Sequence, residues 1–350
     1  MTDGLLTGAA EVRGFTAEAP PTTPDGWLAR AREVAALLTP GVVGVPPRRE
    51  IQLLKDAGLV TVLGPPEHGG GGQEWGVAEH VVRLVSAAHP KVGEMLGYHY
   101  VWSWLARFIG TEEKRLHIAE VAARAKWFFT GAVNMRAADL TVSDGGEDIV
   151  FNGRVWPSVG GPVSDITILE GFMPGKDVAI SSLALSTHDG LTFEDDPRSA
   201  DAGAINVVDA AIPWTGALGY VNKEFEPREY NSYLTPTLHI VLSNVYLGIT
   251  RGALEAAVAD IRTRVAQGDG STADTTERAS AKLFGELARK LWAAEAFADA
   301  VSAQVAGVHR DTSTAGAGDR ADYAVKVTAV KAQAVQVARE VLDELRAVTP

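Results

Sequence analysis

The segment from Lys126 to Val163 constrains the fold most, because a helical pattern gives way there to a β-pattern. Two short apolar runs, Trp127–Phe129 and Ile149–Phe151, each lead into a turn that contains glycine. Apolar runs bounded by Gly and Asn turns are typical of β-strands. The residues before Lys126 and after Arg228 carry helical patterns, so the expected order is helices, strands, helices.

This order predicts an α+β chain in four parts. We expect a flexible arm at residues 1–24, an N-terminal helical domain at 25–125, a middle β-barrel-like domain at 126–227 and a C-terminal long-helix bundle at 228–350. The arm is rich in Gly, Ala, Thr and Pro and shows no sustained period. Gly248 and Gly252 in the first bundle helix would permit close contact with a neighbouring helix.

The individual elements follow from periodicity and from helix-ending residues. Helices are expected at about Trp27–Leu38, Arg48–Ala57, Gly76–Ala88, Val92–Ile109 and Glu112–Ala125, and strands near 127–133, 149–156, 165–172, 178–185 and 204–211. The segment LVTVLGPPEHGGGGQEW is expected to be an ordered surface loop, because two prolines and four glycines cannot continue a helix. The segments HDGLTFEDDPRSADAGA and AQGDGSTADTTE are also expected to be loops.

Composition excludes several classes of protein. A net charge of −12 argues against general nucleic-acid binding. No apolar run reaches the roughly 18 residues of a membrane span, and the N-terminus lacks the pattern of a secretion signal. Without cysteine there is no disulfide, no thiolate zinc site and no thiol nucleophile, so we expect a cytoplasmic protein. The scattered histidines predict no metal site, and no Gly-x-Ser-x-Gly motif supports a hydrolase.

Two aromatic groups bear on function. The first group lies in the predicted sheet, where aromatic residues stand near small polar ones. The aromatic residues are Trp127, Phe128, Phe129 and Trp156, and the polar residues are Thr130, Asn134 and Ser158. This set would suit a planar heteroaromatic ligand, or it is an aromatic β-core with polar loop residues. The second group lies on one predicted helix, from Tyr98 to Trp104. Either this helix packs on both sides, or one or two of these residues face a pocket.

Six segments resemble the flavin-dependent monooxygenase branch of the acyl-CoA dehydrogenase superfamily, which includes dibenzothiophene monooxygenase and related sulfur-acquisition oxygenases. They are LLKDAGLVTVLGPPEHGGGGQEW, LGYHYVW, WFFTGAVNMRAADL, VFNGRVWPSVGGPVSD, PWTGALGYVNKEF and NVYLGITRGALEAA. The likeness spans roughly residues 27–348, and it rests on the order and spacing of these segments. It implies an acyl-CoA dehydrogenase-like fold for the α+β chain.

The resemblance also implies an activity. Members of this branch are two-component enzymes, in which a separate flavin reductase delivers reduced FMN. The oxygenase then transfers one oxygen atom from O2 to a small apolar substrate. FMN is therefore expected rather than FAD, and the protein is expected to be a homo-oligomer, either a dimer or a homotetramer.

Site residues carry over onto matching positions. Phe129, Thr130 and Asn134 match the strand and loop that touch the flavin ring. Ser158 matches a small polar residue at the reactive edge of the flavin, with Trp156 behind it. Tyr98 matches a tyrosine beside the oxygen-reaction site. Arg264 matches an arginine that reaches the flavin phosphate of a neighbouring subunit; alternatively it is a solvated arginine at a helix end. Glu94 and His99, beside Tyr98, are further candidates for acid–base roles.

Three features differ from the family pattern. The family continues into a further C-terminal segment that closes the flavin site, and this sequence ends at Thr349-Pro350 where that segment would begin. The loop EDDPRSADAGA is shorter and lacks the usual Gly-Gln-Arg-Leu-type motif. Glu94 stands where a different polar residue is common, and a carboxylate there could have a raised pKa and act in proton transfer, or it could lie on the surface.

Two alternative functions remain open on these residues. One is an FAD-dependent acyl-CoA dehydrogenase, although no isolated Glu after Arg228 lies in the apolar context that its base requires. The other is a scaffold without flavin that performs redox-neutral chemistry or only binds a ligand, with Tyr98, His99 and Glu94 acting as acid–base groups.

Overall fold

The computed structural model describes residues 19–39, 45–133, 140–176, 179–194, 202–226, 231–267, 270–310 and 317–348. Within these ranges it leaves out the side chains of 157–158, 202, 231–232, 264, 267, 270–280, 308–310, 317–318 and 348. Of the expected N-terminal arm, residues 1–18 lie outside the described residues. None of the described helices has an apolar stretch long enough to cross a lipid bilayer.

The N-terminal helices lie where periodicity predicts them, within three residues at each end. They are α1 (Pro24–Leu37), α2 (Arg48–Asp56), α3 (Trp75–Ala88), α4 (Pro90–Ile109) and α5 (Glu112–Ala125). The Thr23 hydroxyl caps α1 by accepting from the Gly26 N–H, and Thr111 caps α5 in the same way. Gly58 ends α2 with φ of +74°, a conformation that favours glycine.

The segment after α2 is not a surface loop at its start. Leu59–Thr61 forms the 3₁₀-helix η2, and the side chains from Leu59 to Leu63 are buried. The loop then runs through the second 3₁₀-helix, η3 (Pro66–His68), to the glycines before α3. A Cβ on Gly70 would lie 2.3 Å from the backbone of Gly64, so the glycines allow the loop to fold back on itself.

The central part of the chain forms one large sheet and a two-stranded ribbon. The strands are β1 (Phe129–Ala132), β2 (Leu140–Asp144), β3 (Asp148–Val159), β4 (Ile166–Phe172), β5 (Ile180–Leu185), β6 (Leu191–Phe193), β7 (Ala202–Pro213), β8 (Ala217–Leu218), β9 (Tyr220–Val221) and β10 (Glu224–Phe225), with the 3₁₀-helices η4 (Gly161–Val163) and η5 (Trp214–Gly216). The sheet order is β6-β7-β3-β2-β4-β5-β8, and β1 pairs with β4 in parallel. Strands β2, β6, β8, β9 and β10 were not predicted, and β6 lies in a segment that was expected to be loop.

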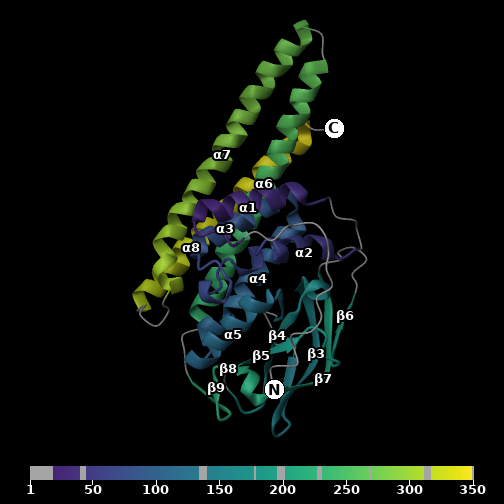
Figure 1. Ribbon diagram of the computed structural model, residues 1–350. Coiled ribbons are helices and arrows are strands. Elements are labelled where there is room, and N and C mark those ends of the chain that lie inside the picture. The colour runs from purple at the N-terminus through teal and green to yellow at the C-terminus, as the bar shows by residue number, and fades with distance from the viewer. Residues whose placement is uncertain are drawn as a thin grey trace.

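The C-terminal region forms three long helices in the described part of the chain. They are α6 (Asn231–Gln267), α7 (Gly270–Arg310) and α8 (Ala317–Val348). Figure 1 shows α6 and α7 as an antiparallel hairpin whose far end projects from the rest of the molecule. The segment AQGDGSTADTTE was expected to be a loop, but α7 already begins at Gly270, so most of that segment is helical.

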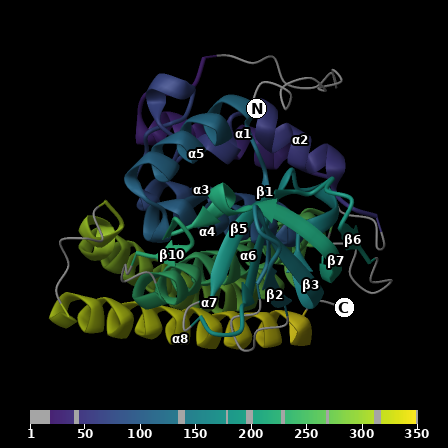
Figure 2. The same cartoon turned by 90° about the horizontal axis from the view of Figure 1, so that it is seen from below.

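The helices and the sheet share an extensive core. One buried cluster joins helices from both ends of the chain with β1 and β4, and a second fills the interior of the sheet. Viewed from below, the strands lie in front of the helices, between the N-terminal helices and α8 (Figure 2). Helix α4 packs against both β1 and α6, so it connects the strand region with the bundle.

Candidate functional site

Helix α4 carries the polar residues that the resemblance singles out. Glu94 and Tyr98 are four residues apart, so they lie on one face of the helix, and both are partly buried. Burial is the main cause that raises the pKa of Tyr98 to about 12, and nearby Glu94 and Tyr246 of α6 contribute to the same rise. Tyr98 is therefore a protonated phenol at neutral pH, and it is available to donate a hydrogen bond between α4 and α6.

His99 points away from this face and connects three parts of the fold. Its Nδ1 accepts a hydrogen bond from the Phe129 N–H (3.0 Å), and its Nε2–H donates to the Val60 carbonyl oxygen (2.7 Å). Its ring stacks on Phe128 with centroids 4.9 Å apart. Because both nitrogens contact backbone groups, the hydrogen bonds fix the neutral tautomer that carries its proton on Nε2.

These contacts do not support the acid–base role expected for His99. The side chain is buried, and this burial lowers the pKa of His99 to about 4, more than the contact with Val60 raises it. A neutral imidazole with both nitrogens engaged has no site left for proton transfer. His99 instead positions the first residue of β1, and we regard it as a positioning residue.

The predicted flavin contacts on β1 are closed off by the fold itself. Phe129 and Thr130 are buried, and the Thr130 hydroxyl donates to the Val159 carbonyl oxygen (2.7 Å) in β3. Beside them, a Cβ on Gly131 would lie 2.7 Å from the Trp102 ring of α4. The side chains of Phe129 and Thr130 therefore hold β1 in place, and a direct flavin contact from them stays a prediction.

The remaining predicted residues are described only in part. Trp156 is 45% exposed on β3, and its expected position behind Ser158 stays a prediction. Ser158 pairs with Gly203 across β3 and β7, next to an irregularity in the register. The side chains of Ser158 and Arg264, and all of Asn134, lie outside the described residues.

Asp165 is a connecting residue that sequence reasoning did not find. Its Oδ2 accepts from Lys55 Nζ of α2 (2.5 Å) and from the Phe128 N–H (2.6 Å). These two hydrogen bonds attach the start of β1 to the N-terminal helices. Lys55 and Asp165 are 110 residues apart in the sequence, so no local pattern could indicate that they pair.

Several cavities lie at the outer end of α4 and along α5. One of them, with a volume of about 910 Å³, is a groove between α5 and the region from η5 to β9. Aromatic and aliphatic side chains line it, including Ile118, Trp127, Leu183, Trp214 and Tyr220. Its lysines already have partners, because Lys114 donates to two backbone carbonyl oxygens and Lys223 pairs with Asp144.

Comparisons with known proteins place this fold. No family model matches the chain. It is 29% identical over 307 residues to the dibenzothiophene monooxygenase of Rhodococcus qingshengii, covering 81% of this chain and 73% of that protein. It is 25% identical over 248 residues to the probable FMNH2-dependent monooxygenase SfnC of Pseudomonas putida, covering 67% of this chain and 62% of that protein.

Solved structures agree with these sequence matches. The methanesulfinate monooxygenase MsuC of Pseudomonas fluorescens superposes with a TM-score of 0.80 at 19% identity, over 92% of this chain and 86% of that one. The complex of TdsC from Paenibacillus sp. A11-2 with FMN and indole gives 0.79 at 22% identity, over 91% and 86%. Butyryl-CoA dehydrogenase from Megasphaera elsdenii gives 0.74 at 17% identity, over 92% and 86%.

The chain therefore has the α+β fold of the acyl-CoA dehydrogenases, as predicted. Its resemblance to the flavin-dependent monooxygenase branch of that superfamily is also confirmed.

Proposed function

We propose that this protein is an FMN-dependent monooxygenase of the two-component type. A separate flavin reductase supplies reduced FMN, and the enzyme inserts one oxygen atom from O2 into a small apolar substrate. The observation that carries the proposal is the placement of Tyr98, a partly buried, protonated phenol beside Glu94 on the helix that packs against β1. Relatives named as monooxygenases, aligned over 81% of the chain, support the same activity.

The described residues fit a flavin. A planar heteroaromatic ring requires aromatic or apolar walls and a few neutral hydrogen-bond donors. Trp156 on β3 is 45% exposed and offers an aromatic face for such a ring, and the protonated Tyr98 hydroxyl is a neutral donor. When bound, reduced FMN supplies the two electrons that reduce O2, so that one oxygen atom enters the substrate and the other leaves as water.

Three residues have defined roles in this proposal. Tyr98 holds its proton at neutral pH and donates it as a hydrogen bond toward the reacting oxygen. Glu94 favours this protonated form, because a nearby negative charge disfavours the phenolate. His99 holds β1 against α4, and the surrounding aromatic side chains exclude water from the reaction.

The proposal also covers the remaining flavin contacts, the oligomer and the location of the protein. Asn134 and Ser158 would contact the flavin, with Trp156 nearby, and Arg264 would reach the cofactor of a neighbouring subunit in a homotetramer. The exposed Trp292 and Phe297 on the long helix α7 support assembly into an oligomer. We place the protein in the cytoplasm, where a reductase can deliver reduced flavin by diffusion.

An anaerobic flavin titration tests the proposal. Purified protein is titrated with FMN and FAD, both oxidised and reduced, and followed by absorbance and fluorescence. We expect micromolar or tighter binding that favours reduced FMN. Tyr98→Phe should bind reduced FMN nearly as well, but should lose oxygen transfer at least about tenfold, since it removes a positioned donor. Tyr246→Phe is the matched control on α6.

Two other outcomes would favour a different function. Tight FAD binding with turnover of CoA esters would favour an acyl-CoA dehydrogenase. Binding of neither flavin would exclude both redox reactions and leave the redox-neutral scaffold.

A further inference from the structure

Among the described residues, Arg107, near the C-terminal end of α4, has no carboxylate within ion-pair distance. Its Cζ lies 4.1 Å from the centre of the Trp104 ring. In the described part of the chain it makes no other hydrogen bond or ion pair, although its side chain is partly buried. Burial lowers the pKa of Arg107, the charge of Arg115 lowers it further, and the charge of Glu67 offsets only part of this change. Such a group is unusual, because a charge removed from water is normally paired.

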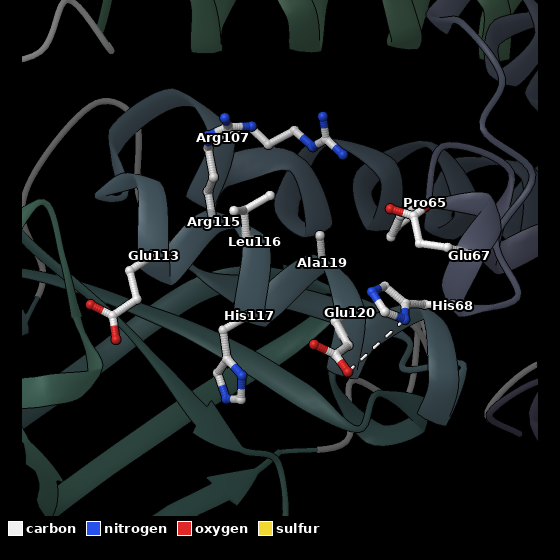
Figure 3. Close-up of a pocket in the computed structure, with 10 residues that line it drawn as sticks. All are labelled: Pro65, Glu67, His68, Arg107, Glu113, Arg115, Leu116, His117, Ala119 and Glu120. Carbon is white, nitrogen blue, oxygen red and sulfur yellow. Dashed lines mark ion pairs between the residues drawn. The ribbon is translucent and has the colours of Figure 1, made fainter.

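The position of Arg107 gives its N–H groups access to open space. It lines three cavities, of about 500, 380 and 40 Å³, at the junction of α4, α5 and the loop that precedes α3. Figure 3 shows the first of these, with Arg107 and Arg115 along one side and His68 next to Glu120 on another. The Trp104 ring covers one face of the guanidinium, so the edge that carries the N–H donors stays available.

A second donor in the same place also has no acceptor. Trp104 is only 9% exposed, and its buried Nε1 has no hydrogen-bond partner among the described residues. Trp104 lines two of the three cavities together with Arg107. An indole N–H is a donor only, and burial without an acceptor is unfavourable. Two independent groups therefore lack an oxygen acceptor at this corner of the fold.

The carboxylates near Arg107 do not fill this role. Glu67 and Glu113 are exposed at the rim of the cavity, and Glu67 does not approach Arg107 within ion-pair distance. Glu120 is already held by Arg124 (3.0 Å) and lies 3.9 Å from His68, as the dashed line in Figure 3 marks. Arg115 pairs with Glu112.

We propose that Arg107 and Trp104 form a binding site for a small oxyanion, such as sulfate, phosphate or a carboxylate. The oxyanion lies at the edge of the guanidinium and accepts from its N–H donors, and the indole N–H of Trp104 provides a further donor. A planar guanidinium that is stacked on an aromatic ring is preorganised for this contact. The site is separate from the Tyr98 face of α4 and does not depend on the flavin function.

Binding of simple anions tests the proposal. Sodium sulfate, sodium phosphate and sodium acetate are titrated into the full-length protein by calorimetry and by thermal unfolding, against sodium chloride at equal ionic strength. We expect a saturable rise in Tm with at least one oxyanion and none with chloride. Arg107→Gln should weaken that binding about tenfold or more, because it removes the charged donors.

Matched variants separate this site from general electrostatic effects. Arg115→Gln removes an equal charge from the same cavity and should change the affinity less than threefold. Trp104→Phe keeps the stacked ring but removes the N–H, and should weaken binding several-fold. Glu67→Gln should leave binding intact or tighten it. The proposal is wrong if no oxyanion binds saturably, if Arg107→Gln and Arg115→Gln behave alike, or if Glu67→Gln abolishes binding.

Discussion

Two buried residues titrate in the same pH range with opposite effects on stability. His99 is held neutral, with its pKa lowered to about 4 by burial. Glu79 of α3 is also buried, and burial raises its pKa to about 7 despite the lowering influence of Ser302 and Arg83. In the unfolded chain both groups return to ordinary pKa values, near 6.5 for His and 4.3 for Glu.

The sign of each effect follows from proton linkage. Between pH 6.5 and 4 the unfolded state binds the His99 proton and the folded state does not, so the contribution of His99 to stability falls as the pH falls. Between pH 4.5 and 7 the folded state holds the Glu79 proton, so the contribution of Glu79 falls as the pH rises. Each effect amounts to about 2–3 kcal/mol at its limit.

We predict that removing one titrating group leaves the pH dependence of the free energy of unfolding that the other group produces. His99→Gln keeps an amide that can replace both hydrogen bonds but does not titrate, so its free energy of unfolding should decrease from pH 5 to pH 7. Glu79→Gln should show the reverse, with stability increasing over the same range. Urea denaturation at several pH values measures both slopes, and identical profiles for the two variants would contradict the assignments.

At the scale of elements, close helix packing at two glycines joins α3 to α6. A Cβ on Gly248 would lie 2.3 Å from the Arg83 carbonyl oxygen, and one on Gly252 would lie 2.0 Å from that of Ala87. The predicted close contact is thus confirmed. Next to it, Arg83 donates to Asn244 of α6 (2.6 and 2.9 Å) and to Asp299 of α7 (2.6 Å), so three helices share one polar network.

Gly252→Ala should destabilise the protein by about 1–3 kcal/mol, because the added methyl meets backbone that cannot rotate away. Gly285→Ala on α7 is the matched control, since a Cβ there meets nothing within 4 Å. That variant should gain up to about 1 kcal/mol from helix propensity alone. Denaturant unfolding compares the two, and equal effects would mean that the α3–α6 packing does not limit the substitution.

On the scale of the whole molecule, the α6–α7 hairpin extends well beyond the region that the other elements cover (Figure 1). Trp292 on α7 is 62% exposed, an unusual position for a large aromatic side chain. We expect this surface to contact another subunit.

Trp292→Glu should lower the oligomeric state, because it places a charge in the contact. Light scattering during size-exclusion chromatography measures the mass, with wild type expected as a dimer or tetramer. Val208→Glu on β7 changes a residue that is 64% exposed and serves as the control that should leave the mass unchanged. A monomeric wild-type protein, or equal masses for all three, would argue against this interface.

The sequence by itself determined the helices and most strands, because their signals are local. Periodicity, capping residues such as Thr111, and Gly58 act over a few neighbours, and they placed the ends of α1 to α5 within three residues. Local signals failed where a tertiary partner decides the state. Strand β6 forms because it pairs with β7, and the segment from Leu59 to Leu63 is buried against α4.

The residues of the candidate site also differ in whether local sequence or tertiary structure determines their role. The resemblance selected Tyr98, and its position four residues from Glu94 follows from helix geometry alone. Only the tertiary structure decided what His99 does, since its two partners, Val60 and Phe129, lie 39 and 30 residues away. The same holds for Arg107. Its lack of a nearby carboxylate partner follows from how α4, α5 and the loop before α3 pack around it. A residue's type is local, but its burial, and with it its pKa and partners, depends on segments far apart in the chain.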